Sequence, residues 1–361
     1  MPGKLGFLSA FLIPLLVVTG FYLGDWWSYS VFAFVFFLIP VADALVGLDT
    51  RNQPEHLKSE VAEDFGYRLI MFVWVPLQFG FLFWAIQQLA TNPDLNFVEY
   101  SGLLVGTGMV TGGIGITVAH ELGHKNNKLE QLLSQALLVT VCYTHFYIEH
   151  NRGHHVQVAT PEDPATARKG ENFFAFFIRS VVMGWIHAWH LEKERLIRKE
   201  RSVFGLRNRM IHYIILPILF CLSLCLFAAY VNPTVSWSSV ILFFIGQSII
   251  GFGLLELVNY VEHYGITRKK LPNGSYERVN PLHSWNTAYL ISNLFLFQLQ
   301  RHSDHHTYAS KRYQVLDHSD ESPQLPYGYP TMILMALIPP IWFSVMDKKL
   351  EEWKNQLPLQ A

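Results

Sequence analysis

Six long apolar runs constrain this chain more than any other feature of its sequence. They cover residues 5–23, 28–48, 67–90, 99–119, 211–231 and 236–258. Each is long enough to cross the hydrocarbon core of a bilayer, which takes about 20 residues of helix. Inside a bilayer the backbone must satisfy its own hydrogen bonds, so such runs predict helices. We therefore expect an all-α integral membrane protein with six transmembrane helices.

The positions of Lys and Arg between these runs predict how the helices are oriented. Both residue types are absent from the short connections 24–27, 92–98 and 232–235, and present in the longer segments 49–66, 120–210 and 259–361. Basic segments stay on the cytoplasmic side of a membrane. We expect both termini and the segments 120–210 and 259–361 in the cytoplasm, within one domain that covers residues 1–361.

Three further apolar runs are not expected to cross. A crossing at 132–148 would put neighbouring histidine clusters on opposite sides of the membrane. The run 172–189 contains Arg179 and two histidines, which suits a helix lying in the membrane interface. The run 329–345 contains Pro339 and Pro340 and precedes a charged tail. We expect buried or surface-lying helices in all three.

Charge and cysteine content exclude several classes of protein. The net charge is −1, which argues against nucleic acid as a partner. The three cysteines, Cys142, Cys221 and Cys225, form no C-x-x-C pair. A disulfide framework, a zinc ribbon and a built-in rubredoxin-type iron site are therefore not expected.

Four histidine-rich words lie in the segments expected in the cytoplasm. HELGHK (120–125) fits the H-E-x-x-H pattern of zinc peptidases, and it is followed by EHNRGHH (149–155), EHYG (262–265) and RHSDHH (301–306). The histidines in these words are His120, His124, His150, His154, His155, His263, His302, His305 and His306. One catalytic zinc needs three protein ligands, so six would be unused. Two metals would use all nine, although imidazole suits iron, copper, zinc and nickel alike.

Four carboxylates adjoin these histidines and are candidates for orienting them. Glu121, Glu149, Glu262 and Asp304 each lie next to a predicted ligand. A carboxylate that accepts the outer N–H of a ligand imidazole fixes the ring. The alternative is a solvated or helix-capping carboxylate. We expect structural roles for the remaining histidines, His56, His145, His187, His190, His212, His283 and His318.

The fourth apolar run is rich in glycine and leads directly into His120. Gly108 and Gly112 leave room either for a slender ligand or for close helix packing. If they line a tunnel, Phe34 and Phe36 on the second run are candidate walls.

Longer words around the histidines carry a resemblance to a known family. HELGHK, EHNRGHHVQVATPEDPATAR, NYVEHYG and LQRHSDHH are similar to signatures of the bacterial membrane alkane 1-monooxygenases, in the membrane di-iron hydroxylase and desaturase superfamily. The resemblance covers nearly the whole chain. It implies a non-haem di-iron centre, two iron ions held by the nine histidines, in a helical cap on the cytoplasmic side of the bacterial inner membrane.

The resemblance also implies a reaction and partners. Medium-chain n-alkanes, drawn from the membrane lipid, would be oxidised by O2 at the terminal carbon to primary alcohols. Electrons would come from a separate rubredoxin, itself reduced by a rubredoxin reductase. The charged stretch EKERLIRKER (192–201) is either a docking site for that protein or a solvated helix face.

Other functions use some of the same residues. A xylene-type alkyl-aromatic monooxygenase or a membrane lipid desaturase would need a similar histidine set. An intramembrane zinc protease would be explained by HELGH alone. A transporter would leave the ATPEDP word and the dense histidine clusters unexplained.

Overall fold

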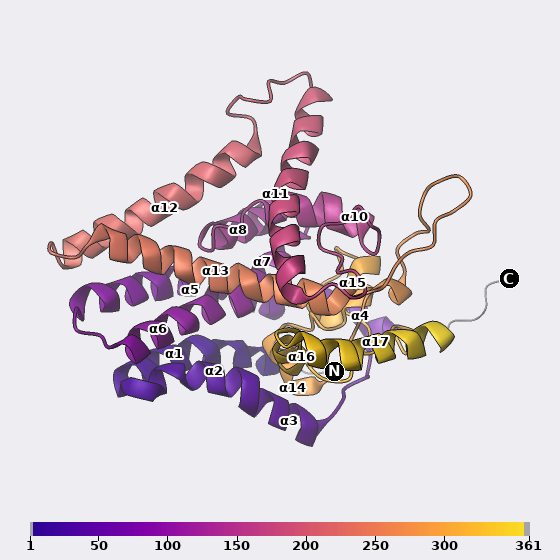
Figure 1. Cartoon of the computed structure of the whole chain (residues 1–361), viewed down its shortest axis with the longest axis horizontal. Coiled ribbons are helices and arrows are strands. Elements are labelled where there is room, and N and C mark those ends of the chain that lie inside the picture. The colour runs from indigo at the N-terminus through magenta and orange to yellow at the C-terminus, as the bar shows by residue number, and fades with distance from the viewer. Residues whose placement is uncertain (1–2, 357–361) are drawn as a thin grey trace.

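Long helices lie side by side along one direction in the computed structural model, which describes residues 3–356 (Figure 1). Six of the helices are long and apolar enough to cross a membrane: Lys4–Leu23, Asp25–Val46, Glu55–Thr91, Phe97–Gly123, Arg209–Val231 and Trp237–His263. Over residues 3–356 no strand forms, and the only β-type contacts are three isolated bridges. The predicted all-α architecture with six candidate membrane helices is thus confirmed.

Several of these long helices are composed of shorter elements. The first joins η1 (Lys4–Phe11) to α1 (Leu12–Leu23), and the second joins η2 (Asp25–Tyr29), α2 (Ser30–Ala33), η3 (Phe34–Leu38) and α3 (Ile39–Val46). The third joins α4 (Glu55–Glu63) to α5 (Phe65–Thr91), and the fourth joins α6 (Phe97–Gly108), η4 (Met109–Ile116) and α7 (Thr117–Gly123). The last two are α12 (Arg209–Val231) and α13 (Trp237–His263). Every one overlaps a predicted run.

Several of the predicted runs extend beyond their expected ends. The third begins earlier because Asp64 starts a new helix, its carboxylate accepting the Gly66 N–H at 2.7 Å. The sixth continues past residue 258 to His263, which brings that histidine to the end of α13. Sequence hydropathy locates the apolar part of a helix and misses such polar continuations.

The fourth long helix contains a π-helical segment, η4, where it meets α13. There the backbone of Gly112 approaches that of Gly251 so closely that a Cβ on Gly112 would overlap it. Small residues allow two membrane helices to touch in this way. Single π-helical turns inside α-helices often mark functional sites.

The runs expected not to cross form shorter or differently directed helices. The first contributes α8 (Lys128–Val139), and the second contributes α11 (Phe173–Ile197), which stands roughly perpendicular to the long helices (Figure 1). The third breaks into α16 (Tyr329–Ala336) and α17 (Pro339–Gln356). None of these is among the helices long and apolar enough to span.

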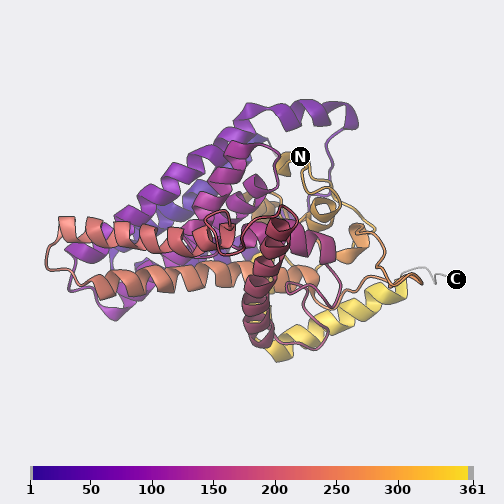
Figure 2. The same cartoon turned by 90° about the horizontal axis from the view of Figure 1, so that it is seen from above.

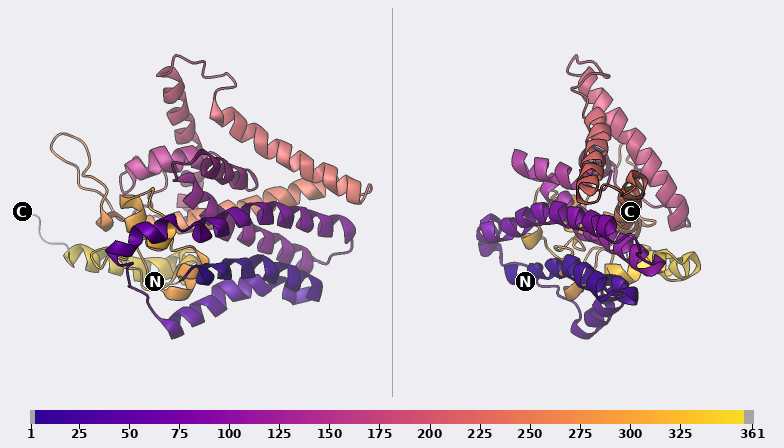
Figure 3. Two further views of the ribbon diagram at one scale, coloured as in Figure 1. Left: turned by 180° about the vertical axis from the view of Figure 1, so that it is seen from behind. Right: turned by 90° about the vertical axis from the view of Figure 1, so that its left-hand side faces the viewer.

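Short helices gather into a cap at one end of the long ones (Figure 2). They are α9 (Phe146–Glu149), η5 (His150–His154), α10 (His155–Gln157), η6 (Pro281–His283), α14 (Leu290–Phe295), α15 (His302–Thr307) and η7 (Tyr313–Val315). Viewed from behind, the cap again lies at one end, with the first two long helices and α12 at opposite edges (Figure 3).

Buried Arg301 ties the cap to the connection that follows the second long helix. Its guanidinium donates to the Leu316 carbonyl at 2.8 Å and the Asp49 carbonyl at 2.9 Å. These bonds fix the start of α15, which carries three of the predicted metal ligands.

Candidate metal centre

All nine histidines of the four words come together in two groups at the cap end of the long helices. The first group contains His120, His124, His150, His155 and His305, and the second contains His154, His263, His302 and His306. Within each group the ligand nitrogens lie within 4.8 Å of one another. The sequence predicts the nine residues; their division into five and four comes from the fold.

The continuous helical segment η5–α10 and the helix α15 each supply side chains to both groups. His150 and His155 point into the first group, whereas His154, between them in sequence, joins the second. The π-helical turn η5 makes this alternation, because its wider turn changes the direction of successive side chains. On α15, His305 belongs to the first group and His302 and His306 to the second. The two groups are therefore neighbours.

Distances between imidazole nitrogens fit a shared metal ion in each group. In the first group, Nε2 of His155 lies 3.1 Å from Nε2 of His150 and 3.2 Å from Nε2 of His305. In the second, Nε2 of His302 lies 3.1 Å from that of His263 and 2.9 Å from that of His306. A metal–nitrogen bond of about 2.1 Å places two ligands at right angles about 3.0 Å apart.

The hydrogen-bond inventory supports the same conclusion. His124 and His154 have buried Nε2 atoms without a partner among the described residues. A buried nitrogen left without a partner is costly, and a bound cation would satisfy it. Burial, together with neighbouring imidazoles, lowers the pKa of His150, His155 and His305 well below the usual value. Neutral imidazole is the form that binds metal ions. The residues thus fit a two-metal centre.

Asp163 is a site residue that the sequence interpretation did not single out. Its Oδ2 lies 2.9 Å from Nδ1 of His154, with both side chains fully buried. Thr166 Oγ1 and the Ala165 N–H donate to the same carboxylate. Burial lowers the pKa of His154, but the Asp163 carboxylate outweighs that effect and raises it. Asp163 lies in the stretch ATPEDPATAR (159–168), where no histidine adjoins it, so the sequence did not indicate a role as a partner of a metal ligand.

Among the four carboxylates predicted to orient ligands, Glu262 contacts one of the nine histidines. Its Oε2 lies 3.1 Å from Nε2 of His302, and its Oε1 accepts the hydroxyl of Tyr329 at 2.6 Å. Nε2 is the nitrogen that faces the second group, so Glu262 adjoins the metal position itself. That is a different role from the predicted one of accepting an outer N–H.

Glu121 and Asp304 bind lysines instead of imidazoles, which corrects their predicted roles. Glu121 accepts Lys125 at 2.9 Å, because a residue next to His120 projects onto another helix face, where the residue at i+4 lies. Asp304 accepts Lys311 at 2.7 Å. Both stabilise the cap.

Glu149 contacts a histidine outside the nine. Its Oε1 lies 3.3 Å from Nδ1 of His187 on α11. The expected contact with a ligand imidazole is absent from the hydrogen bonds of residues 3–356. None of the seven histidines predicted as structural belongs to either group.

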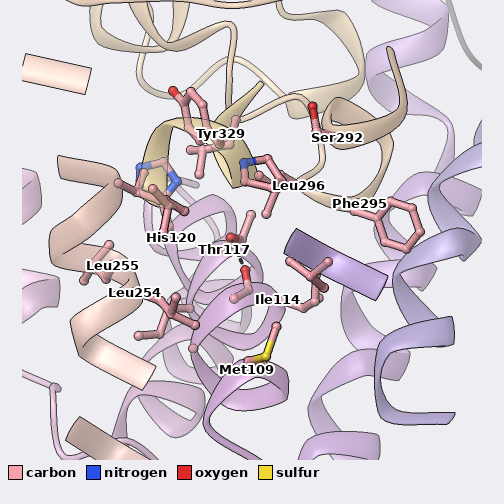
Figure 4. A pocket seen from close by; sticks show the side chains of 18 of the residues that line it. Met109, Ile114, Thr117, His120, Leu254, Leu255, Ser292, Phe295, Leu296 and Tyr329 are labelled. Carbon is pink, nitrogen blue, oxygen red and sulfur yellow. Dashed lines mark hydrogen bonds between the residues drawn. The ribbon is translucent and has the colours of Figure 1, made fainter. Parts of the chain in front are cut away.

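An apolar cavity leads from the long helices to the histidines (Figure 4). It encloses about 960 Å³ of space not filled by protein atoms, part of it open to the exterior. Met109, Leu254 and Phe295 line its apolar part, and His120, His150 and His302 line its inner end. Thr117, also in the lining, donates its hydroxyl to the Gly113 carbonyl at 2.7 Å.

The cavity lining includes two of the four predicted channel residues. Phe36 and Gly112 line it, as does Gly113. Gly108 does not, because it packs against Ile250 on α13, whose side chain would lie 2.5 Å from a Cβ added to Gly108. Phe34 does not either, since its ring packs on Phe295 at 5.6 Å.

Comparisons with known proteins agree with this site. Residues 95–335 match the family model described as fatty acid desaturase. The chain is 46% identical to alkane 1-monooxygenase 2 of Pseudomonas aeruginosa, over 94% of this chain and 91% of that protein. It is 40% identical to alkane 1-monooxygenase 2 of Alcanivorax borkumensis, over 97% of this chain and 91% of that protein. It is 27% identical to the hydroxylase component of the xylene/toluene monooxygenase of Pseudomonas putida, over 97% of this chain and 90% of that protein.

Proposed function

This chain belongs to the fatty acid desaturase family and to its alkane 1-monooxygenases, and we propose that it hydroxylates medium-chain n-alkanes at the terminal carbon. It is an O2-using oxidoreductase. In the proposed reaction, alkane, O2, two electrons and two protons give a primary alcohol and water.

The observation that carries the proposal is the cavity that joins an apolar region to two groups of histidines. A saturated hydrocarbon has no polar group to bind, so only shape and apolar contact can position it. Met109, Ile116 and Leu254 supply such contact along the cavity, and His120 and His302 lie where it ends. A chain lying along the cavity would bring its end towards the histidines.

The nine histidines would hold two iron ions, one in each group, with the group assignments given above. Bound in this way, the two irons would supply the activation of O2 that no amino-acid side chain provides. Glu262 holds the Tyr329 hydroxyl proton between the two side chains at 2.6 Å, beside the second group. The apolar lining excludes bulk water from the end of the cavity, which protects reactive chemistry from side reactions.

The proposed electron donor is a separate rubredoxin, reduced in turn by a rubredoxin reductase. The three cysteines cannot bind an iron ion as rubredoxin does, because such a site needs paired C-x-x-C ligands. Charged residues are concentrated in the cap and on α11, away from the apolar helices. By the positive-inside rule, the cap and both termini face the cytoplasm of a bacterial inner membrane.

The family also contains proteins with other substrates. The similarity to a xylene/toluene monooxygenase component supports alkyl-aromatic oxidation as the second candidate. A membrane lipid desaturase is the third, because the matching family model bears that description.

One experiment separates the three. The protein is purified in lipid, reduced without oxygen, and given O2 with octane, p-xylene or an acyl lipid. We expect 1-octanol from octane as the main product, with two irons per chain by metal analysis. Methylbenzyl alcohol as the main product would favour the second candidate, and an unsaturated acyl chain would favour the third. One zinc and no iron would contradict all three.

A further inference from the structure

We propose that the hairpin 267–279, together with Val156, forms the docking surface for a small acidic electron-carrier protein. We call these residues the carrier surface. The inference rests on the proposed function, since it requires electrons to reach the histidines from a separate protein.

The hairpin projects from the cap at the end of the molecule away from the long helices (Figure 1). It is closed by a bridge between Lys270 and Tyr276. Arg268 anchors it to the metal-site segment, its backbone N–H donating to the Ala159 carbonyl at 2.7 Å and its guanidinium to the Val156 carbonyl at 2.8 Å. A partner seated on this hairpin would therefore also touch α10.

His155, which begins α10, is among the less buried of the nine histidines. Its ring contacts His305 of the first group, with centroids 4.9 Å apart, and stacks on His306 of the second at 4.3 Å. The next residue, Val156, is 63% exposed. Electron transfer slows steeply with distance, so a carrier would deliver electrons best at the point where both groups lie nearest the surface.

The charge of the carrier surface favours an acidic partner. It contains the basic residues Arg268, Lys269, Lys270 and Arg278. The acidic residues beside them are Glu162 and Glu277, and the Glu277 carboxylate already accepts the Lys269 N–H and contacts His283. Complementary charge raises the rate at which two proteins meet. Exposed Val156 supplies an apolar contact from which water is excluded on docking.

The charged stretch 192–201, which the sequence also offers as a docking site, is less suited. Glu192 is buried and binds Arg195 and Arg209, so part of its charge is already paired. The stretch lies at the end of α11 that points away from α10 and α15 (Figure 1).

The test is a charge reversal on the hairpin, read out as binding. Full-length protein in lipid nanodiscs is titrated with zinc-substituted rubredoxin, which cannot exchange electrons. The double variant Lys269→Glu/Lys270→Glu should bind about tenfold more weakly than the wild type at low salt, with a smaller salt dependence. Melting temperature and gel-filtration profile check that the variant is folded.

The matched control is Arg198→Glu/Lys199→Glu, which makes the same charge change on two exposed residues of the rival stretch. It should bind like the wild type. Unchanged binding by the hairpin variant, or an equal loss in the control, would overturn the docking surface. A loss seen only in nanodiscs of anionic lipid would also overturn it, and would make the hairpin a membrane contact.

The two proposals fail in different ways. A wild-type protein that binds the carrier through the hairpin but makes no alcohol from octane would overturn the alkane proposal and support the docking surface. A protein that makes 1-octanol with a chemical reductant would support the alkane proposal. If it also binds the carrier equally well after charge reversal, the docking surface is overturned.

Discussion

Asp163 holds His154 through a contact of 2.9 Å between its Oδ2 and the imidazole Nδ1, in a position where neither side chain is exposed. Nδ1 is thereby occupied as a donor, and Nε2 is left free to face the second group. Thr166 and the Ala165 N–H hold the carboxylate from the other side. The aspartate therefore fixes both the tautomer and the direction of one proposed ligand.

Replacing Asp163 should weaken the metal centre without removing a ligand. Asp163→Asn keeps the shape but removes the negative charge, so we expect about 10–100-fold lower metal affinity or activity. Iron content after dialysis against a chelator measures the metal affinity, and 1-octanol formation measures the activity. Glu162→Gln, which changes an exposed neighbouring carboxylate, is the control and should behave like the wild type. Equal iron retention in both variants would show that Asp163 does not support His154.

Each of the nine histidines should be required for turnover. We expect His263→Ala to lose activity and to bind fewer than two irons, because its Nε2 lies 3.1 Å from that of His302 within a group of four. His318→Ala, which removes a ring paired with exposed Asp320, should keep both irons. Metal analysis of both variants tests the ligand set directly. A fully active His263→Ala protein with two irons would remove His263 from that set.

Glu192 should stabilise the junction between α11 and α12 in a pH-dependent way. Burial raises its pKa, but Arg195 and Arg209 outweigh that effect and hold the pKa at about 2. Since this lies below the value of 4.5 expected on unfolding, the stabilisation is present above pH 4.5 and is lost between about pH 4.5 and 2.

Glu192→Gln should therefore melt at a lower temperature than the wild type at pH 7. We expect a loss of about 2 kcal/mol, less than for a fully buried pair, because both arginines still reach water. Melting curves in detergent at several pH values measure it. The gap between the two proteins should narrow as the pH falls towards 3, and a constant gap would show that the Glu192 charge does not contribute.

Cysteine labelling should establish the orientation of the cap. In a variant without the native cysteines, Lys128→Cys on the cap side should be protected from an impermeant thiol reagent added to intact cells. Asp94→Cys, in the connection between α5 and α6, should be labelled; both positions are exposed. The reverse pattern would place the cap outside the cytoplasm.

The number and positions of the long helices follow from hydropathy, because apolar length is a property of each segment alone. Eight of the nine histidines are predicted by their spacing at about one helical turn, and His263 by its place directly after the sixth apolar run. Their division into two groups depends on the π-helical turn at His150–His154, which no local pattern marks. Contacts between distant residues are missed for a similar reason: Asp163 meets His154 only through the turn between them.

The four carboxylates show most clearly which contacts cannot be predicted from the sequence. Four are predicted as partners because they adjoin a histidine in sequence, yet neighbours on a helix point about 100° apart. Glu121 consequently pairs with Lys125, and Asp304 with Lys311. Glu262 meets His302 from a different helix, through the folded arrangement of α13 and α15.

The glycines of the fourth long helix lead to the last prediction, on chain length. Gly108 and Gly112 pack against α13, so a side chain at either position would push the helices apart. Gly113 lines the cavity, and a Cβ there would meet no atom within 4 Å. Gly113→Leu should therefore fill the cavity and leave the packing intact. We expect the variant to oxidise short alkanes and to lose activity on long ones, because the chain end must still reach the histidines. Competition assays with a mixture of alkanes, analysed as alcohols, measure the shift in chain-length preference.

Gly108→Leu is the matched control for Gly113→Leu. The same side chain, placed against Ile250, should lower expression or melting temperature without changing the chain-length preference of the enzyme that remains active. A folded Gly113→Leu protein with the wild-type product profile would show that this part of the cavity does not hold the alkane.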